Sequence, residues 1–229
     1  MEYVKNCFYI NLNERIDRKE HVEKQLDALK INYNRFSAIK PSNLQVGCSL
    51  SHLKCLEMAK EQKLEHIMIV EDDILFTNPK LFIQQCNKFF SNNINWDVLI
   101  ISGNNIPPYD KIGDYSVKIS RCQTTTGYIV KSHYYDKLIN NIKEGINLLI
   151  QNPNEHVKYA IDKHWFSLQL RDNWYLITPL TVTQKSGYSD IEKKHINYDH
   201  LMLDLDKAWL FKTSSICKNT SSVVNRFKV

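Results

Sequence analysis

The stretch HIMIVEDDILF, residues 66–76, predicts the centre of the fold. Its residues 67–70 form a short unbroken apolar run, which is typical of a parallel strand covered on both faces. The run leads into three adjacent carboxylates, Glu71, Asp72 and Asp73, which repel one another and lose hydration when they are buried. A divalent cation offsets both costs, and open α/β sheets bind ligands at the carboxyl ends of their strands. The stretch therefore predicts a metal or ligand site, with a solvated acidic turn as the alternative.

The composition favours one large domain that does not bind nucleic acid. The chain has 229 residues, of which 43% are hydrophobic, and no linker rich in Pro, Gly or Ser interrupts it. Its net charge of +5 is spread along the chain without a run of five basic residues. No stretch approaches the roughly 18 apolar residues of a membrane helix, and the N-terminus lacks the apolar segment of a signal peptide. We expect a soluble, cytoplasmic protein, for which peripheral association with a membrane stays open.

The cysteines show no Cys-x-x-Cys pair and no other zinc spacing. Several of them lie inside apolar patterns, so we expect reduced, buried thiols and not a disulfide or zinc framework. The six residues are Cys7, Cys48, Cys55, Cys86, Cys122 and Cys217.

Strand and helix patterns alternate along the chain, without an internal repeat or a glycine-rich phosphate loop. Apolar runs predict strands at 7–12, 34–39, 67–70, 96–101, 128–130, 174–177 and 180–183. Helical periodicity predicts helices at 22–29, from 48, from 79, from Ser132 as N-cap, from 160, and around 201–210. We expect turns or loops at 102–105, 104–118 (a loop or lid) and 184–192, and a bend between edge strands at Pro179. The alternation predicts an α/β sandwich with a largely parallel sheet.

Polar residues near the starts of the first two helices are candidate ligands. Arg15 and Arg18 lie between the first strand and the first helix, where arginine forks and helix amides suit a diphosphate. The alternative for these arginines is a solvated basic turn. Ser51 and His52 lie early in the second helix, where the histidine could contact a base or sugar, or be a satisfied residue at the core edge.

A series of motifs, in this order, resembles glycosyltransferase family 25, which includes lipooligosaccharide glycosyltransferases and procollagen galactosyltransferase-like enzymes. The motifs span roughly residues 3–195. They are NLNERIDR (11–18), GCSLSH (47–52), VEDD (70–73), WD with an apolar strand that ends in Gly103, TTTGYIV (124–130), AID (160–162) and Q-x-x-G-x-S-D-I (184–191).

This resemblance implies the GT-A fold of nucleotide-diphospho-sugar transferases, a single Rossmann-like α/β/α sandwich with a mixed, mostly parallel sheet. It implies one glycosyltransferase domain over 1–229, with a nucleotide-binding half at about 1–100 ending at the EDD motif, an acceptor-side half at about 101–200, and a C-terminal helix and tail at 201–229. The implied reaction moves a sugar, expected to be galactose or glucose, from a UDP-sugar to a hydroxyl of a glycan or a hydroxylysine-type protein acceptor. Transfer would proceed with inversion and with Mn²⁺ or Mg²⁺ as cofactor.

The family's motifs also imply the residues of the site. The implied metal ligands are Glu71, Asp72 and Asp73, which here form an ExD variant of the family's acidic triplet. Inversion requires a base for the acceptor hydroxyl, and Asp162 is the first candidate and Asp190 the second. For Asp162 the alternative is a carboxylate favoured by a helix N-terminus. The expected donor-binding residues are Asn11, Leu12, Arg15, Arg18, Ala38, Ser51, His52, Asp72 and Gln184.

Two other classes of protein stay open. One is a non-catalytic relative that binds a nucleotide sugar or acts as a scaffold, which the ExD variant and the short chain would suit. The other is an unrelated metal-dependent phosphoesterase, because such enzymes also use clustered carboxylates.

Overall fold

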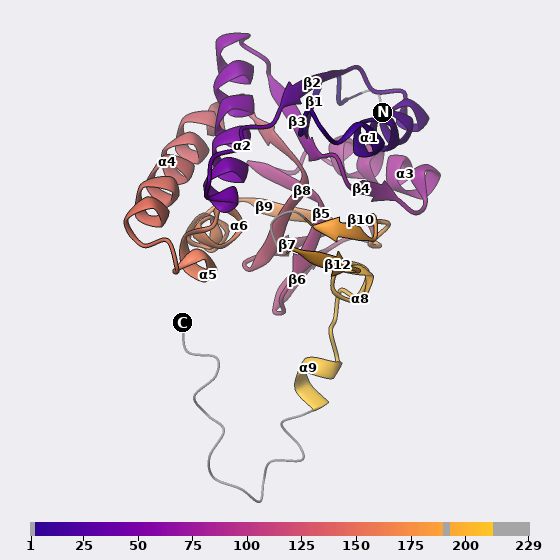
Figure 1. Cartoon of the computed structure of the whole chain (residues 1–229). Coiled ribbons are helices and arrows are strands. Elements are labelled where there is room, and N and C mark those ends of the chain that lie inside the picture. Colours follow the sequence, from indigo (N-terminus) through magenta and orange to yellow (C-terminus); the bar gives the residue numbers. More distant parts are fainter. Residues whose placement is uncertain (1–2, 190–192, 213–229) are drawn as a thin grey trace, which may run out of the picture.

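An eight-stranded sheet forms the centre of the molecule in the computed structural model, which describes residues 3–189 and 193–212 (Figure 1). The strands follow the order β2-β1-β3-β8-β5-β9-β7-β6. Their bounds are β1 Cys7–Asn11, β2 Tyr33–Ser37, β3 His66–Glu71, β5 Val98–Asn105, β6 Tyr109–Ile112, β7 Ser116–Ile119, β8 Cys122–Lys131 and β9 Trp174–Ile177. Only β7 and β8 of this sheet run against the other strands, so the sheet is mixed and mostly parallel, as predicted.

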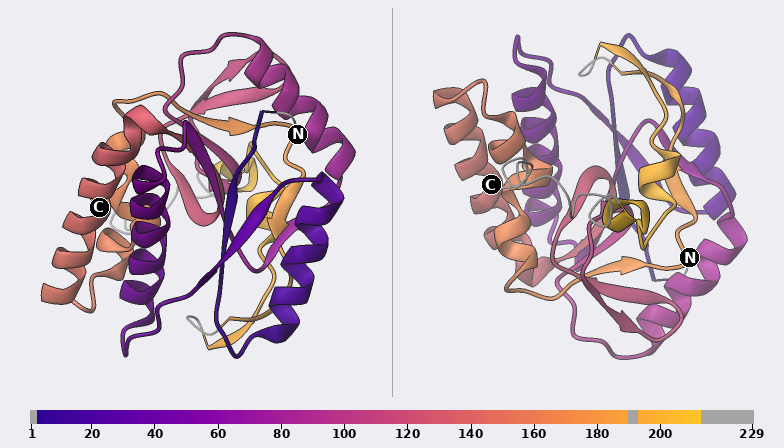
Figure 2. Two further views of the ribbon diagram at one scale, coloured as in Figure 1. Left: turned by 90° about the horizontal axis from the view of Figure 1, so that it is seen from above. Right: turned by 90° about the horizontal axis from the view of Figure 1, so that it is seen from below.

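Helices cover both faces of the sheet, which makes the fold an α/β/α sandwich (Figure 2). The helices α1 (Ile16–Leu29) and α3 (Pro79–Ser91) cover one face. The opposite face is covered by α2 (Leu44–Glu61), α4 (Tyr135–Gln151), and the short helices α5 (His156–Tyr159), α6 (Ile161–His164) and α7 (Phe166–Gln169). The predicted α/β fold class is confirmed.

The strand β3 shows why the sheet is buried on both sides. Ile67 and Ile69 pack in the core beneath α2 and α4, whereas Met68 and Val70 pack in the core beneath α1 and α3. Successive side chains of a strand point to opposite faces, so an unbroken apolar run is required where both faces are covered. The prediction of a strand covered on both faces is confirmed for residues 67–70, but β3 is parallel only to β1 and runs antiparallel to its other neighbour, β8.

Local capping explains where the helices begin. Asn43 accepts hydrogen bonds from the backbone amides of Gln45 and Val46, so α2 starts at Leu44 and not at Cys48 as predicted. Ser132 does not cap α4; it lies in a 3₁₀ turn, Ser132–Tyr134, that precedes the helix. The prediction of a single C-terminal helix was also wrong, since two short helices, α8 (Asp199–Met202) and α9 (Trp209–Lys212), lie there.

Three predicted loops or edges are corrected by strand pairing. Residues 104–118 form no open loop, because they contain β6 and β7, which pair as an antiparallel hairpin. Residues 102–105 are not a turn but continue β5 alongside β8, with irregular register. The strand β9 lies between β5 and β7 and is therefore not an edge strand. The polar side chains of residues 102–118 did not indicate strands. Strands can nevertheless form there, because backbone pairing depends little on side-chain polarity.

Two small sheets complete the fold. The strand β10 (Val182–Gln184) pairs with β4 (Ile74–Phe76), and β11 (Gly187–Ser189) pairs with β12 (Lys194–Ile196). Four of the predicted buried cysteines are buried and Cys48 is half-buried, all as free thiols, whereas Cys217 lies outside the described residues. Within 3–189 and 193–212, no helix combines the length and apolar character needed to span a bilayer.

Candidate active site

A cavity of about 520 Å³ opens where β1 and β3 end. Its wall draws on elements from both predicted halves of the chain, including α2, β8, α6 and β10. It contains every described residue predicted for the site: Asn11, Leu12, Arg15, Arg18, Ala38, Ser51, His52, Glu71, Asp72, Asp73, Asp162 and Gln184. The second base candidate, Asp190, lies outside the described residues.

Asp72 and Asp73 share one guanidinium. Nη1 of Arg18 lies 2.9 Å from Oδ1 of Asp72 and 3.1 Å from Oδ2 of Asp73. Nδ2 of Asn11 donates to the other oxygen of Asp72 at 2.8 Å. The remaining oxygen of Asp73, Oδ1, is buried and has no hydrogen-bond partner among the described residues. A buried carboxylate oxygen without a partner is costly, so this oxygen is available to a cation.

Burial dominates the protonation of these two carboxyls. It raises the pKa of Asp72, against the effects of Arg18 and Asn11. For Asp73, burial followed by the neighbouring charge of Glu71 raises the pKa to about 7, although Arg18 acts in the opposite direction. A bound cation would reverse this balance, because an opposite charge favours the ionised form.

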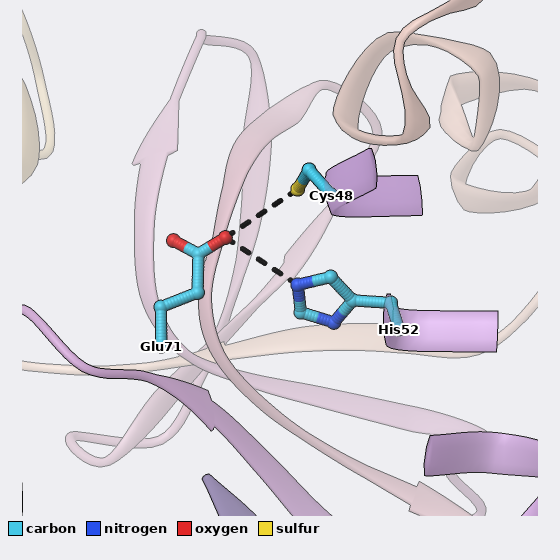
Figure 3. Close-up of side chains that lie close together, drawn as sticks. All are labelled: Cys48, His52 and Glu71. Carbon is cyan, nitrogen blue, oxygen red and sulfur yellow. Dashed lines mark hydrogen bonds and ion pairs between the residues drawn. The ribbon is translucent and has the colours of Figure 1, made fainter. Parts of the chain in front are cut away.

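Glu71 points away from the pair that Arg18 holds, because it belongs to the strand face covered by α2. Its Oε1 accepts a hydrogen bond from Thr125 at 2.8 Å and lies 3.4 Å from Nε2 of His52 and 3.6 Å from Sγ of Cys48 (Figure 3). Burial acts to raise the pKa of Glu71, but the contacts with His52 and Thr125 outweigh it and lower the pKa. Glu71 thus has neighbours different from those of Asp72 and Asp73, and the three predicted metal ligands do not form one cluster of carboxylates.

The two predicted arginines have different surroundings. Arg15 pairs with the exposed Asp17 at 3.0 Å, whereas Arg18 pairs with the buried Asp72, although the two arginine side chains are similarly exposed, at 21% and 18%. Nη2 of Arg18 also donates to the carbonyl oxygen of Tyr188 at 3.0 Å, which links α1 to β11. Both arginines line the cavity, and Arg18 is the one that contacts the acidic strand end.

Two residues of α2 that were predicted to bind the nucleotide-sugar donor, Ser51 and His52, also form contacts within the protein. The hydroxyl of Ser51 donates to the carbonyl of Gly47 and accepts from the amide of Ile39, which fixes the segment that contains Ala38. His52 is fully buried, with Nδ1 3.1 Å from the hydroxyl of Tyr128.

Asp162 lies in the first turn of α6, as predicted. Its Oδ2 accepts a hydrogen bond from the amide of Thr124 at 3.1 Å and lies 3.9 Å from Nζ of Lys163. Thr124 has a φ of 74°, a rare conformation for a β-branched residue, and this aims its amide at the carboxylate. Irregular strand register in β5 and β8 occurs beside it, as is common next to active sites.

Gln184 reaches the cavity because β10 pairs with β4, which places it opposite Ile74. The next residue, Lys185, donates its backbone amide to the carbonyl oxygen of Asp73 at 2.7 Å. This pairing brings the predicted closing segment to the acidic strand end.

Sequence reasoning missed several residues of the cavity wall. Lys163 and Lys185 are cations adjacent in sequence to Asp162 and Gln184, and burial lowers the pKa of Lys163. Cys48 is a further residue of the wall, and no Cys-x-x-Cys spacing marks it as a ligand. The available signal was its position four residues before His52, which places both on one face of α2.

The cavity lies at the carboxyl ends of parallel strands in an α/β sandwich. This places the protein in the class of α/β proteins that bind ligands at this edge of the sheet. Residues 4–46 and 42–100 match the model of glycosyltransferase family 25 (LPS biosynthesis protein). The family predicted from the motifs is thus confirmed over these residues, and the match supports a sugar-transferring activity.

Several solved structures resemble the chain at low sequence identity. A glycosyltransferase involved in the glycosylation of the major capsid of PBCV-1 is 10% identical, with 83% of this chain and 96% of that chain covered and a TM-score of 0.48. An apo UDP-glucose pyrophosphorylase is 9% identical, with 91% and 82% covered and a TM-score of 0.45. A mannose-1-phosphate geranyltransferase from Thermus thermophilus is 6% identical, with 80% and 74% covered and a TM-score of 0.44. None of the curated proteins compared with the chain matches it.

Proposed function

We propose that the protein transfers a sugar from a nucleoside diphosphate donor, expected to be UDP-galactose or UDP-glucose, to a hydroxyl of a glycan or protein acceptor. The observation that carries the proposal is the convergence of Arg18, Asp72, Asp73 and Asp162 on one cavity, in a chain whose first hundred residues match family 25. These side chains come from three separate segments of the sequence.

In this proposal Asp72 and Asp73 hold Mn²⁺ or Mg²⁺ through hard carboxylate oxygens, including Oδ1 of Asp73, which has no hydrogen-bond partner within residues 3–189 and 193–212. When bound, such an ion neutralises the charge that develops on the departing diphosphate. Asn11 keeps Asp72 oriented through its 2.8 Å hydrogen bond. Arg18 would turn from the carboxylates toward the diphosphate, and Lys163 and Lys185 would add positive charge at the cavity wall.

Asp162 is the proposed base for inversion. Its carboxylate would accept the proton of the acceptor hydroxyl while that oxygen bonds to the anomeric carbon and the bond to the diphosphate breaks. The electron pair of that broken bond leaves with the diphosphate. The hydrogen bond from Thr124 fixes one carboxylate oxygen, which limits the side chain to one orientation.

A second candidate is a relative that binds the donor without catalysis. It is favoured by Arg18, whose guanidinium already neutralises both Asp72 and Asp73. If that ion pair persists with donor bound, the guanidinium occupies the region proposed for the cation.

Release of nucleoside diphosphate from a panel of donors, with and without Mn²⁺, tests the proposal. Metal-dependent release that increases with an added hydroxyl acceptor supports a transferase. Donor binding in calorimetry without release would identify the non-catalytic relative. Turnover of simple phosphodiesters would instead identify a phosphoesterase.

A further inference from the structure

Cys48, His52 and Glu71 form a second group of potential metal ligands, separate from Asp72 and Asp73. Their donor atoms all lie within 4.8 Å of one another (Figure 3). Cys48 and His52 lie one helical turn apart on α2, and Glu71 reaches them from the end of β3. The group is therefore held by two elements that pack against each other in the core.

The distances from the Glu71 oxygen to the other two donor atoms fit tetrahedral coordination. Bonds of about 2.3 Å from zinc to sulfur and about 2.0 Å to nitrogen and oxygen place the sulfur ~3.5 Å and the nitrogen ~3.3 Å from the oxygen. The observed distances to Oε1 of Glu71 are 3.6 Å from Sγ of Cys48 and 3.4 Å from Nε2 of His52. The latter is long for a hydrogen bond, whose usual length is about 2.9 Å.

The surroundings of His52 also suit a metal ligand. Binding through Nε2 requires the proton to be on Nδ1, and Nδ1 lies 3.1 Å from the hydroxyl of Tyr128, which can accept it. Thr125 donates to Glu71 at 2.8 Å and restrains the carboxylate in the same way. Both ligand side chains are thus oriented by second partners, as in established metal sites.

We propose that Cys48, His52 and Glu71 bind a borderline-soft divalent cation of the zinc class. A thiolate and an imidazole select such ions over Mg²⁺ or Mn²⁺, which prefer oxygen ligands. All three residues line the cavity, so a water molecule or an oxygen of a bound sugar can complete the coordination. The cation would fasten α2 to the end of β3 at the cavity wall.

Cobalt binding tests the site, because Co²⁺ substitutes for zinc and reports a thiolate ligand by its charge-transfer absorption. The untagged full chain, reduced and freed of metal by a chelator, is titrated with Co²⁺ and then with Zn²⁺. We expect one equivalent of cobalt with thiolate absorption, displaced by Zn²⁺ and not by excess Mg²⁺. Cys48→Ser should abolish the absorption and weaken Zn²⁺ binding at least ~100-fold, and Tyr128→Phe should weaken it ~10-fold.

Matched variants separate this site from other cysteines and from the proposed catalytic ion. Cys55→Ser, a buried cysteine on the same helix, and Asp73→Asn should both keep the cobalt spectrum. In a second measurement, mass spectrometry monitors the rate at which Cys48 is alkylated in the protein without substitutions. Zn²⁺ should slow this alkylation at least ~10-fold, whereas Mg²⁺ should not. Absence of thiolate absorption, its persistence in Cys48→Ser, or equal alkylation with and without Zn²⁺ would overturn the assignment.

Discussion

Nη1 of Arg18 lies 3.1 Å from Oδ2 of Asp73, a contact that joins the first turn of α1 to the end of the acidic strand. Both side chains are mostly buried, with exposed fractions of 18% and 16%. The positive charge of Arg18 reduces the net negative charge at the strand end without a metal ion. It also determines how these residues should respond to substitution.

Replacing Arg18 should destabilise the metal-free protein. Arg18→Ala removes the shared guanidinium and leaves Asp72 with only its hydrogen bond from Asn11, so the free energy of unfolding should fall by ~1–3 kcal/mol. Arg15→Ala is the matched control, since Arg15 pairs with the exposed carboxylate of Asp17 and its loss should cost less than ~1 kcal/mol. Urea denaturation of both variants without divalent cations measures the difference. Equal losses would show that Arg18 adds nothing beyond a surface ion pair.

Asp73→Asn should remove metal-dependent turnover. The amide keeps the size of the side chain but removes one anionic ligand, so the metal-dependent rate should fall at least ~100-fold. Asp17→Asn, at an exposed carboxylate on α1, is the control and should keep its activity. Circular dichroism verifies that both variants fold, and a folded Asp73→Asn protein with normal activity contradicts the metal assignment.

The stability of the metal-free protein should decrease as the pH rises toward 7. The folded Asp73 carboxyl has a pKa of about 7, above its ordinary value of 3.8, so the folded state binds more protons between these values. The free energy of unfolding therefore falls as pH increases through this window. Mn²⁺ binding should strengthen over the same range, because the ion requires the ionised carboxylate.

Melting curves of the protein and of Asp73→Asn, recorded from about pH 5 to about pH 8, measure the stability effect. The asparagine variant cannot titrate at this position, so its melting temperature should decline less. Parallel curves for the two proteins would assign the pH dependence to other groups.

Asp162→Asn should separate a base from a structural carboxylate. The asparagine oxygen can still accept the hydrogen bond from Thr124, so the local geometry should persist while the basic group is lost. We expect turnover to fall ~10²–10⁴-fold with donor affinity nearly unchanged. Single-turnover rates and donor calorimetry on one preparation measure both quantities. Preserved turnover per folded molecule would move the role to Asp190 or another carboxylate.

Gly47→Ala should disturb the helix that carries Cys48, Ser51 and His52. A Cβ at Gly47 would lie 2.5 Å from the carbonyl oxygen of Ile39, so α2 must shift, and we expect a loss of ~1–3 kcal/mol in stability. Gly187→Ala is the control, since no atom of the described residues lies within 4 Å of a Cβ there. Thermal melting compares the two variants, and an unchanged melting temperature for Gly47→Ala would show that the helix has room to adjust.

The sequence by itself determined the α/β class and the cavity residues that follow strand ends. The apolar run at 67–70 and the carboxylates after it required a buried strand with a polar end, because strand periodicity and burial are local properties of the chain. The order of the motifs also predicted Asp162 and Gln184 as site residues, and both lie on the cavity wall.

Only the tertiary structure decided which of these residues contact one another. The alternation of β3 turns Glu71 toward α2 and leaves Asp72 and Asp73 to Arg18, although the three carboxylates are adjacent in sequence. Strand pairing likewise turned the expected loop at 104–118 into a hairpin. The physical reason is that side-chain pairing depends on how elements pack across the sheet, and residues as distant as Arg18 and Asp73 meet only after α1 and β3 have packed together.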